Sequence, residues 1–88
     1  MNEQDNIILL RTVVRRVLVA QAGYALTEGL IVERCERHFP GQRLDISDVR
    51  EAVEWNTAKG YLSSRINPDL EEREWLATKA GIAKENIK

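Results

Sequence analysis

The segment 47–78 restricts the fold of this chain more than any other part of the sequence. It opens with a helical pattern, since Val49, Val53 and Asn56 recur on one face of a 3.6-residue wheel. Gly60 follows, and glycine readily takes the left-handed conformation that ends a helix. Two short runs with strand character come next, with turn residues between them. This order predicts an α+β domain in which a helix leads directly into a β-hairpin.

The boundaries of these elements follow from local signals. The helix is expected over 46–59, with Ser47 as the N-cap because its hydroxyl can accept from a free backbone N–H. The first strand is expected over 61–66 and the second over 73–78. Between them, the Asn-Pro-Asp sequence at 67–69 is typical of a tight turn.

Two further helices precede this unit, and 88 residues leave room for a single domain spanning 1–88. Residues 1–5 are polar and expected to be frayed, and a helix is expected over 7–21. Its core face holds six apolar residues: Ile7, Leu10, Val13, Val14, Val17 and Leu18. A second helix is expected over 28–38, with Thr27 as its N-cap. Residues 81–88 are expected to form a short C-terminal tail.

The first helix carries a second, thinner stripe on the side opposite its core face. Its members are Ile8, Thr12, Arg15 and Val19. One interpretation is that the C-terminal tail covers them, or that they are scattered surface residues that need no explanation. The other is a surface for self-association, because a small domain gains much from burial in a dimer. Both interpretations stay open, so a homodimer through the first helix is one expected assembly.

The overall charge argues against a protein whose whole surface is basic. The net charge is −1 at pH 7 and the sequence pI is about 5.8. A local basic patch remains compatible with this balance, and the sequence does not show whether six arginines gather or scatter: Arg11, Arg15, Arg16, Arg34, Arg37 and Arg43. The single cysteine, Cys35, cannot form an internal disulfide, and no apolar run is long enough to span a membrane. A cytoplasmic protein is expected.

Few residues suggest catalytic or metal chemistry. Cys35 and His38 supply half of a zinc site at best, and no second pair completes it, so a core thiol beside a boundary imidazole is favoured. No glycine loop with the spacing of a phosphate cradle is present. The acids near the hairpin turn have the character of a solvated loop. We therefore expect no enzyme activity, no cofactor, no metal and no small-molecule substrate.

Two residues of the third helix depart from its pattern. Asn56 falls on the buried face, where an amide must be hydrogen-bonded, and we expect it to bond backbone in the hairpin or in the loop before the second helix. Trp55 projects from the outward face. Its side chain either folds back over a strand of the hairpin or anchors a partner, since tryptophan is enriched at binding hot spots.

These features together resemble the winged helix-turn-helix superfamily over nearly the whole chain. The resemblance rests on three runs: Val49-Arg50-Glu51-Ala52-Val53, Lys59-Gly60-Tyr61-Leu62 and Trp75-Leu76-Ala77-Thr78-Lys79-Ala80-Gly81. Within that superfamily the chain is similar to small winged-helix proteins of Mu-like transposable phages, including the closing run Gly81-Ile82-Ala83-Lys84. The resemblance implies a three-helix core followed by a β-hairpin wing.

The resemblance also implies a function. In winged-helix DNA binders the third helix enters the major groove and the wing touches the flanking backbone, and here those roles would fall to 47–59 and 65–73. The residues expected to contact double-stranded DNA are Ser47, Arg50, Glu51, Lys59, Arg65 and Arg73. The first hypothesis is accordingly a DNA-binding transcriptional regulator, or an accessory protein of a phage or prophage.

The sequence departs from that pattern in its charges. The outward face of the third helix and the wing tip are both acidic: Asp48, Glu51 and Glu54 lie on the helix, and Asp69, Glu71 and Glu72 lie at the tip. Acids at these positions oppose phosphate contact. The second hypothesis is therefore a protein-interaction module without DNA binding, which uses Trp55 or the stripe of Ile8, Arg15 and Val19. A continuous positive band across the third helix and the wing would favour DNA.

Overall fold

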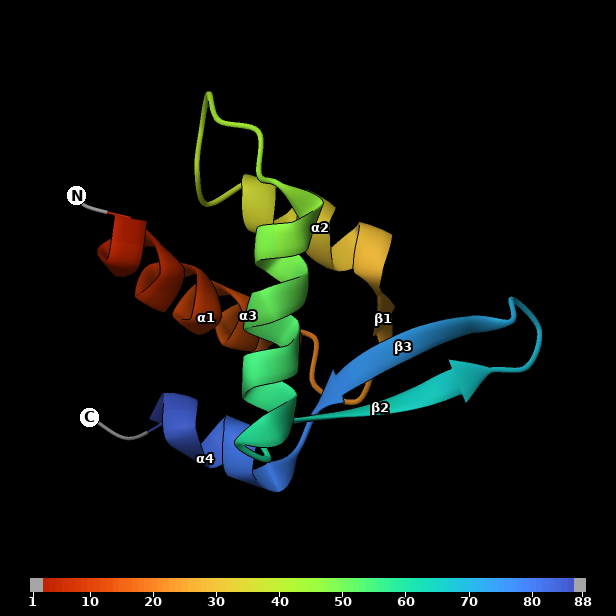
Figure 1. The fold of residues 1–88 in the computed structure, drawn as a ribbon. Coiled ribbons are helices and arrows are strands. Elements are labelled where there is room, and N and C mark those ends of the chain that lie inside the picture. The colour runs from red at the N-terminus through yellow and green to blue at the C-terminus, as the bar shows by residue number, and fades with distance from the viewer. Residues whose placement is uncertain (1–2, 87–88) are drawn as a thin grey trace.

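The computed structural model describes residues 3–86, and side-chain burial from residue 6 onward. Within that range the chain is α+β, as expected from the sequence, with four helices and three strands (Figure 1). In chain order they are α1 (Glu3–Ala20), β1 (Leu26–Thr27), α2 (Glu28–Glu36), α3 (Ile46–Ala58), β2 (Leu62–Asn67), β3 (Glu72–Ala77) and α4 (Lys79–Asn86). The expected order of three helices and a hairpin is therefore present, with β1 and α4 in addition.

The core lies where α1, α2 and α3 pack together at the base of the hairpin. Its buried apolar residues come from every one of these elements: Leu10, Val13, Val14, Val17, Leu18, Leu26, Ile31, Cys35, Val49, Ala52, Val53 and Leu62. Five of the six residues expected on the core face of α1 are buried, whereas Ile7 is 36% exposed. Ile46, the first residue of α3, is 50% exposed because it begins that helix at the surface.

The sheet is antiparallel in the order β1-β3-β2. β1 is only two residues long and pairs with Trp75 and Glu74, so the outer part of the hairpin has no third strand. The hairpin consequently projects from the helices on the side away from the start of α1 and the end of α4 (Figure 1). Burial falls along β2 in the same direction, from Leu62 at 2% exposed to Ile66 at 55%.

Two expectations about helix starts are wrong. The first helix begins at Glu3, so residues 3–5 are helical and not frayed, while Met1 and Asn2 lie outside the described residues. The third helix is capped by Asp45 and not by Ser47. Asp45 Oδ1 accepts from the backbone N–H of Ser47 at 2.9 Å and from its hydroxyl at 2.7 Å, which satisfies an amide of the first turn.

The expected C-terminal tail is also wrong for residues 81–86, which belong to helix α4; residues 87–88 lie outside the described range. Thr78 starts this helix, because its hydroxyl oxygen accepts from the N–H of Gly81 at 3.1 Å and its own hydroxyl donates to Gly60 O at 2.6 Å. Its backbone N–H donates to Tyr61 O at 3.0 Å. Gly81 is buried inside α4, where it lets the helix pass close to this Tyr61 carbonyl.

We expect Gly81→Ala to destabilise the fold, although alanine favours a helix more than glycine does. A Cβ at Gly81 would collide with the carbonyl oxygen of Tyr61, and overpacking against backbone costs about 1–3 kcal/mol. Gly29→Ala in α2 is the matched control, because open space surrounds that position and the change should stabilise by about 0.5–1 kcal/mol. Urea unfolding measures both variants, and equal effects would contradict the close contact.

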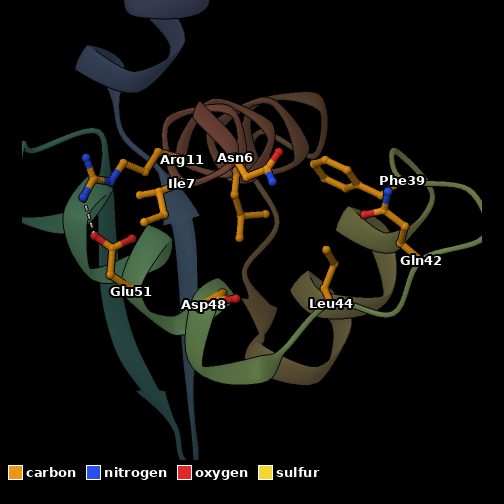
Figure 2. A pocket seen from close by; sticks show the side chains of 9 residues that line it. Asn6, Ile7, Arg11, Phe39, Gln42, Leu44, Asp48 and Glu51 are labelled. Carbon is orange, nitrogen blue, oxygen red and sulfur yellow. Dashed lines mark hydrogen bonds and ion pairs between the residues drawn. The ribbon is translucent and has the colours of Figure 1, made fainter. Parts of the chain in front are cut away.

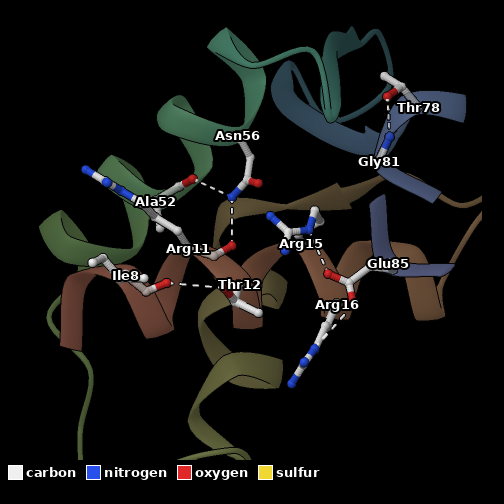
Figure 3. A network of polar contacts seen from close by, with 10 residues as sticks. All are labelled: Ile8, Arg11, Thr12, Arg15, Arg16, Ala52, Asn56, Thr78, Gly81 and Glu85. Atoms are coloured by element: carbon white, nitrogen blue, oxygen red, sulfur yellow. Dashed lines mark hydrogen bonds and ion pairs between the residues drawn. The ribbon is translucent and has the colours of Figure 1, made fainter. Parts of the chain in front are cut away.

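Asn56 joins α3 to α1 in the buried interface (Figure 3). Its Nδ2 donates to Arg11 O in α1 and to Ala52 O in its own helix, both at 2.9 Å. The expected burial and backbone bonding are confirmed, but the expected partner elements are wrong, because the amide faces α1 and not the hairpin. Asn56 Oδ1 is buried and has no hydrogen-bond partner among the described residues.

Asn56→Asp should therefore destabilise the fold by several kcal/mol, because it buries a carboxylate against two carbonyl oxygens. An unpaired buried charge typically costs about 3–5 kcal/mol. Asn56→Leu should change stability by less than about 1.5 kcal/mol, because both carbonyls keep their helical hydrogen bonds and the unpaired Oδ1 is removed. Thermal melts at pH 7 compare the two. A loss of several kcal/mol in the leucine variant would show that the amide is essential.

Candidate functional site

The outward face of α3 and the hairpin hold the residues expected to contact DNA. Ser47, Arg50 and Glu51 are exposed in the first half of α3, and Lys59 is the residue that caps its C-terminal end. Arg65 on β2 and Arg73 on β3 are exposed on the hairpin. Each of these side chains has a partner within the chain, and those partners decide what the surface can bind.

Arg50 forms a bidentate ion pair on this surface. Its Nε and Nη2 donate to the two carboxylate oxygens of Glu28 at 2.9 and 2.8 Å, which joins α3 to the start of α2. The Arg50 hydrogen bond lowers the pKa of Glu28, and Glu28 in turn raises the pKa of Arg50. A bidentate pair of this kind satisfies the guanidinium, so Arg50 is already neutralised before any phosphate approaches.

The indole of Trp55 lies among cations and a second aromatic ring. The Arg11 guanidinium lies 4.9 Å from the ring centroid and the Lys59 ammonium 5.4 Å, within the range of cation–π attraction. Tyr61, just before β2, has its ring 6.3 Å from the indole at a tilt of 49°. Trp55 is half-buried by these contacts. Of the two expectations for this residue, the geometry favours the one in which it folds back toward the wing strand.

The two hairpin arginines are bound more loosely than Arg50. Arg65 Nε donates to Glu74 Oε1 at 3.4 Å across the β2–β3 pair, and the residue Glu74 is only 7% exposed. Arg73 Nη1 donates to the hydroxyl of Ser64 at 2.9 Å. Arg11 forms an ion pair with Glu51 as well as covering Trp55. Arg73 is thus the hairpin arginine without an ion pair among the described residues.

A groove lies beside the acidic start of α3 (Figure 2). It has a volume of about 360 Å³ and separates the N-terminal half of α1 from the loop after α2. Its lining combines apolar and polar side chains: Asn6, Ile7, Leu10, Arg11, Phe39, Gln42, Leu44, Asp48 and Glu51. We call it the α1–α3 groove. No sequence pattern indicates this groove, since Phe39 and Leu44 flank a Pro-Gly turn whose path only packing determines.

The stripe on α1 is divided by helix α4. Arg15 is 8% exposed, because its Nε donates to Glu85 Oε1 of α4 at 2.6 Å and its guanidinium lies 5.3 Å from the Tyr61 ring centroid (Figure 3). Helix α4 therefore covers Arg15, in keeping with the interpretation in which the C-terminal segment lies over the stripe. Val19 is half-buried, and Ile8 is 52% exposed. Self-association through Ile8 stays a prediction.

Cys35 is a core residue, as favoured from the sequence. It is fully buried, and burial raises the pKa of its thiol to about 12, which keeps it protonated and unreactive at neutral pH. His38 is exposed at the end of α2. Among the described residues no three histidine, cysteine or acidic side chains are grouped so that they could hold a metal ion.

Neither a scan against protein-family models nor a search of curated proteins finds a match to this chain. The resemblance to winged-helix proteins and to those of Mu-like phages accordingly stays a prediction. Within residues 3–86, no helix is both long and apolar enough to cross a membrane.

The Glu28–Arg50 pair should stabilise the fold only above the titration range of the carboxylate. Because the folded chain lowers the pKa of Glu28 from its ordinary value of 4.5, the contribution is present above that value and is lost as the pH falls through the lowered one. Glu28→Gln should be less stable than the parent chain at pH 7, and this difference should shrink at an acidic pH below the ordinary value of Glu28. Urea unfolding at both pH values measures this, and a constant difference would contradict the pairing.

Glu33→Gln serves as the control for that measurement. Glu33 pairs with Arg37 at 3.6 Å between two side chains that are each more than 60% exposed, so its loss should change stability little at either pH.

Proposed function

We propose that the chain is a winged-helix protein that binds another protein through the outward face of α3 and the adjoining α1–α3 groove. The winged-helix assignment is supported by the order of the elements, in which α3 leads directly into a projecting hairpin. β1 adds a third strand at the base of that hairpin and ties the α1–α2 connection to it.

The observation that carries the functional proposal is the neutralisation of the surface cations by acids of the same chain. Arg50 is held by Glu28 and Arg11 by Glu51, while the exposed Arg65 approaches Glu74 at 3.4 Å in a weaker pair. Residues 45–59 contain four acids and two bases, and residues 62–77 again contain four acids and two bases. Phosphate contacts supply most non-specific affinity for DNA, so a surface with this balance opposes that partner.

The same surface suits a partner that carries positive charge. Asp48 borders the α1–α3 groove beside the Arg11–Glu51 pair, while Ile7, Phe39 and Leu44 supply apolar lining (Figure 2). Asp48 has no ion pair among the described residues. A protein segment with an apolar side chain flanked by lysine or arginine would fill the groove and pair with its acidic edge, and such complementarity gives specificity.

DNA binding through α3 and the hairpin is the second candidate, and one observation favours it. The hairpin projects from the helices, and Arg73 on β3 is exposed with a neutral hydroxyl as its described hydrogen-bond partner. Arg73 together with Lys59 would be the cations that reach phosphate. With so few free cations, affinity for duplex DNA would be weak and its salt dependence shallow.

A peptide titration distinguishes the two candidates. We expect a peptide of alternating leucine and lysine to bind saturably and to shift the NMR methyl signals of Ile7 and Leu44, while a matched peptide of leucine and glutamate does not. Asp48→Asn should weaken the lysine peptide about two- to fivefold, the loss expected for one exposed ion pair. Glu72→Gln on the hairpin is the control and should change nothing, because Glu72 lies outside the groove.

The same protein samples test the results that would contradict the protein-binding proposal. A mixed-sequence duplex that binds saturably at low salt, and loses affinity with Arg65→Ala and Arg73→Ala, would replace the protein-binding proposal with the DNA-binding candidate. Absence of any shift at Ile7 and Leu44 with the lysine peptide would contradict the groove as the binding surface.

A further inference from the structure

A second pocket lies between the C-terminal half of α1 and the end of α2. It has a volume of about 290 Å³ and is lined by Arg16, Val17, Ala20 and Gln21 from α1 and the following turn, and by Arg34, Arg37 and His38 from α2 and the residues after it. We call it the arginine pocket. The sequence did not show whether the six arginines outside the segment 47–78 gather or scatter. Three of them gather in this pocket.

Among the described residues no acidic side chain lines the arginine pocket, and the ion pairs that its arginines make are weak. Arg37 approaches Glu33 at 3.6 Å, and both side chains are more than 60% exposed, so the pair contributes little. Arg16 Nε donates to Glu85 Oε2 at 3.2 Å, but the same carboxylate binds Arg15 more closely, at 2.6 Å (Figure 3). Two cations of the pocket therefore keep most of their capacity to bind an anion.

Arg34 is the least satisfied of the three. It makes no ion pair among the described residues, and its Nε–H is buried without a protein acceptor there. A buried donor without a partner costs about 1–3 kcal/mol, so an acceptor that reaches this guanidinium gains a favourable interaction. The position of Arg34 in the last turn of α2 complements the helix dipole, but that effect explains one cation and not the convergence of Arg16 from α1.

We propose that the arginine pocket binds a phosphate group. Guanidinium groups match the geometry of phosphate oxygens because their N–H donors lie in a planar fork, and three of them from two helices can surround one tetrahedral anion. His38 and Gln21 add neutral hydrogen-bonding groups at the edge. No residue of α3 or the hairpin lines the pocket, so the site is separate from the surface under Proposed function and does not depend on it.

The phosphate could belong to a small ester, such as a nucleotide, or to a nucleic-acid backbone. Both present the same oxygens to the three arginines. If the source is a small ester, the free ester binds by itself. If the source is a nucleic acid, the pocket is one of several phosphate contacts along the backbone.

NMR titration of the arginine Nε–Hε signals tests the proposal directly. We expect inorganic phosphate to shift the Arg34 and Arg37 signals saturably at constant ionic strength, while chloride does not. Arg37→Gln should weaken phosphate binding by about tenfold, the loss expected for one hydrogen bond between charged groups. Arg37 is exposed, so this change leaves the core intact, and Arg34→Gln gives a second variant. Arg43→Gln is the matched control, because Arg43 is an exposed arginine outside the pocket.

Two further titrations use a nucleoside monophosphate and a mixed-sequence DNA duplex. A nucleotide that shifts the same signals more tightly than phosphate supports a small ester. A duplex that shifts them and is weakened by Arg37→Gln but unaffected by Arg73→Ala supports a backbone phosphate. The proposal is overturned if none of the three ligands gives a saturable shift, or if Arg43→Gln weakens binding as much as Arg37→Gln.

Discussion

The packing of α3 on α1 through Ala52 and Asn56 is the constraint on which the rest of the structure depends. Both residues are fully buried, and the Asn56 amide donates to the backbone of Arg11. This hydrogen bond fixes the position of one turn of α1 against the last turns of α3. The Arg11 side chain then reaches outward to Glu51 and over Trp55. The contact of α1 with α3 thus belongs to the core and also places Arg11 beside Glu51 of α3.

The backbone carbonyl of Tyr61 is a second contact on which the fold depends. It lies where the end of α3 meets the start of α4. It accepts from the Thr78 N–H at 3.0 Å and lies against the bare Cα of Gly81. Because α4 begins at this point, it runs back along α1 and brings Glu85 to Arg15. A surface of α1 that would otherwise be open is closed by this return, and Arg15 becomes a buried residue of the fold.

The near-zero net charge of the chain conceals an uneven distribution. The outward face of α3 and the hairpin carry an excess of acids, whereas the arginine pocket between α1 and α2 has basic side chains and no acidic lining. Both proposed binding surfaces follow from this separation, since a charged surface attracts ligands of the opposite sign. The overall pI near 5.8 would not reveal either surface.

The sequence by itself determined the main elements and much of the core. Apolar spacing located the three long helices, strand character and the turn at 67–69 located the hairpin, and the burial of Asn56 followed from its place on the helix face. These features depend on residues that are neighbours along the chain, so periodicity and local turn chemistry suffice to predict them.

Only the tertiary structure decided the remaining features, because they depend on residues that are distant in sequence. Helix α4 has little amphipathic pattern, and its start depends on the contact of Gly81 with Tyr61. The pairing of Glu28 with Arg50 spans 22 positions, and no local pattern indicates which of the nearby acids takes the arginine. The arginine pocket likewise forms from two helices whose relative position is set by core packing. Helix and strand formation are local, whereas the neutralisation of a charge and the lining of a pocket are properties of the packed chain.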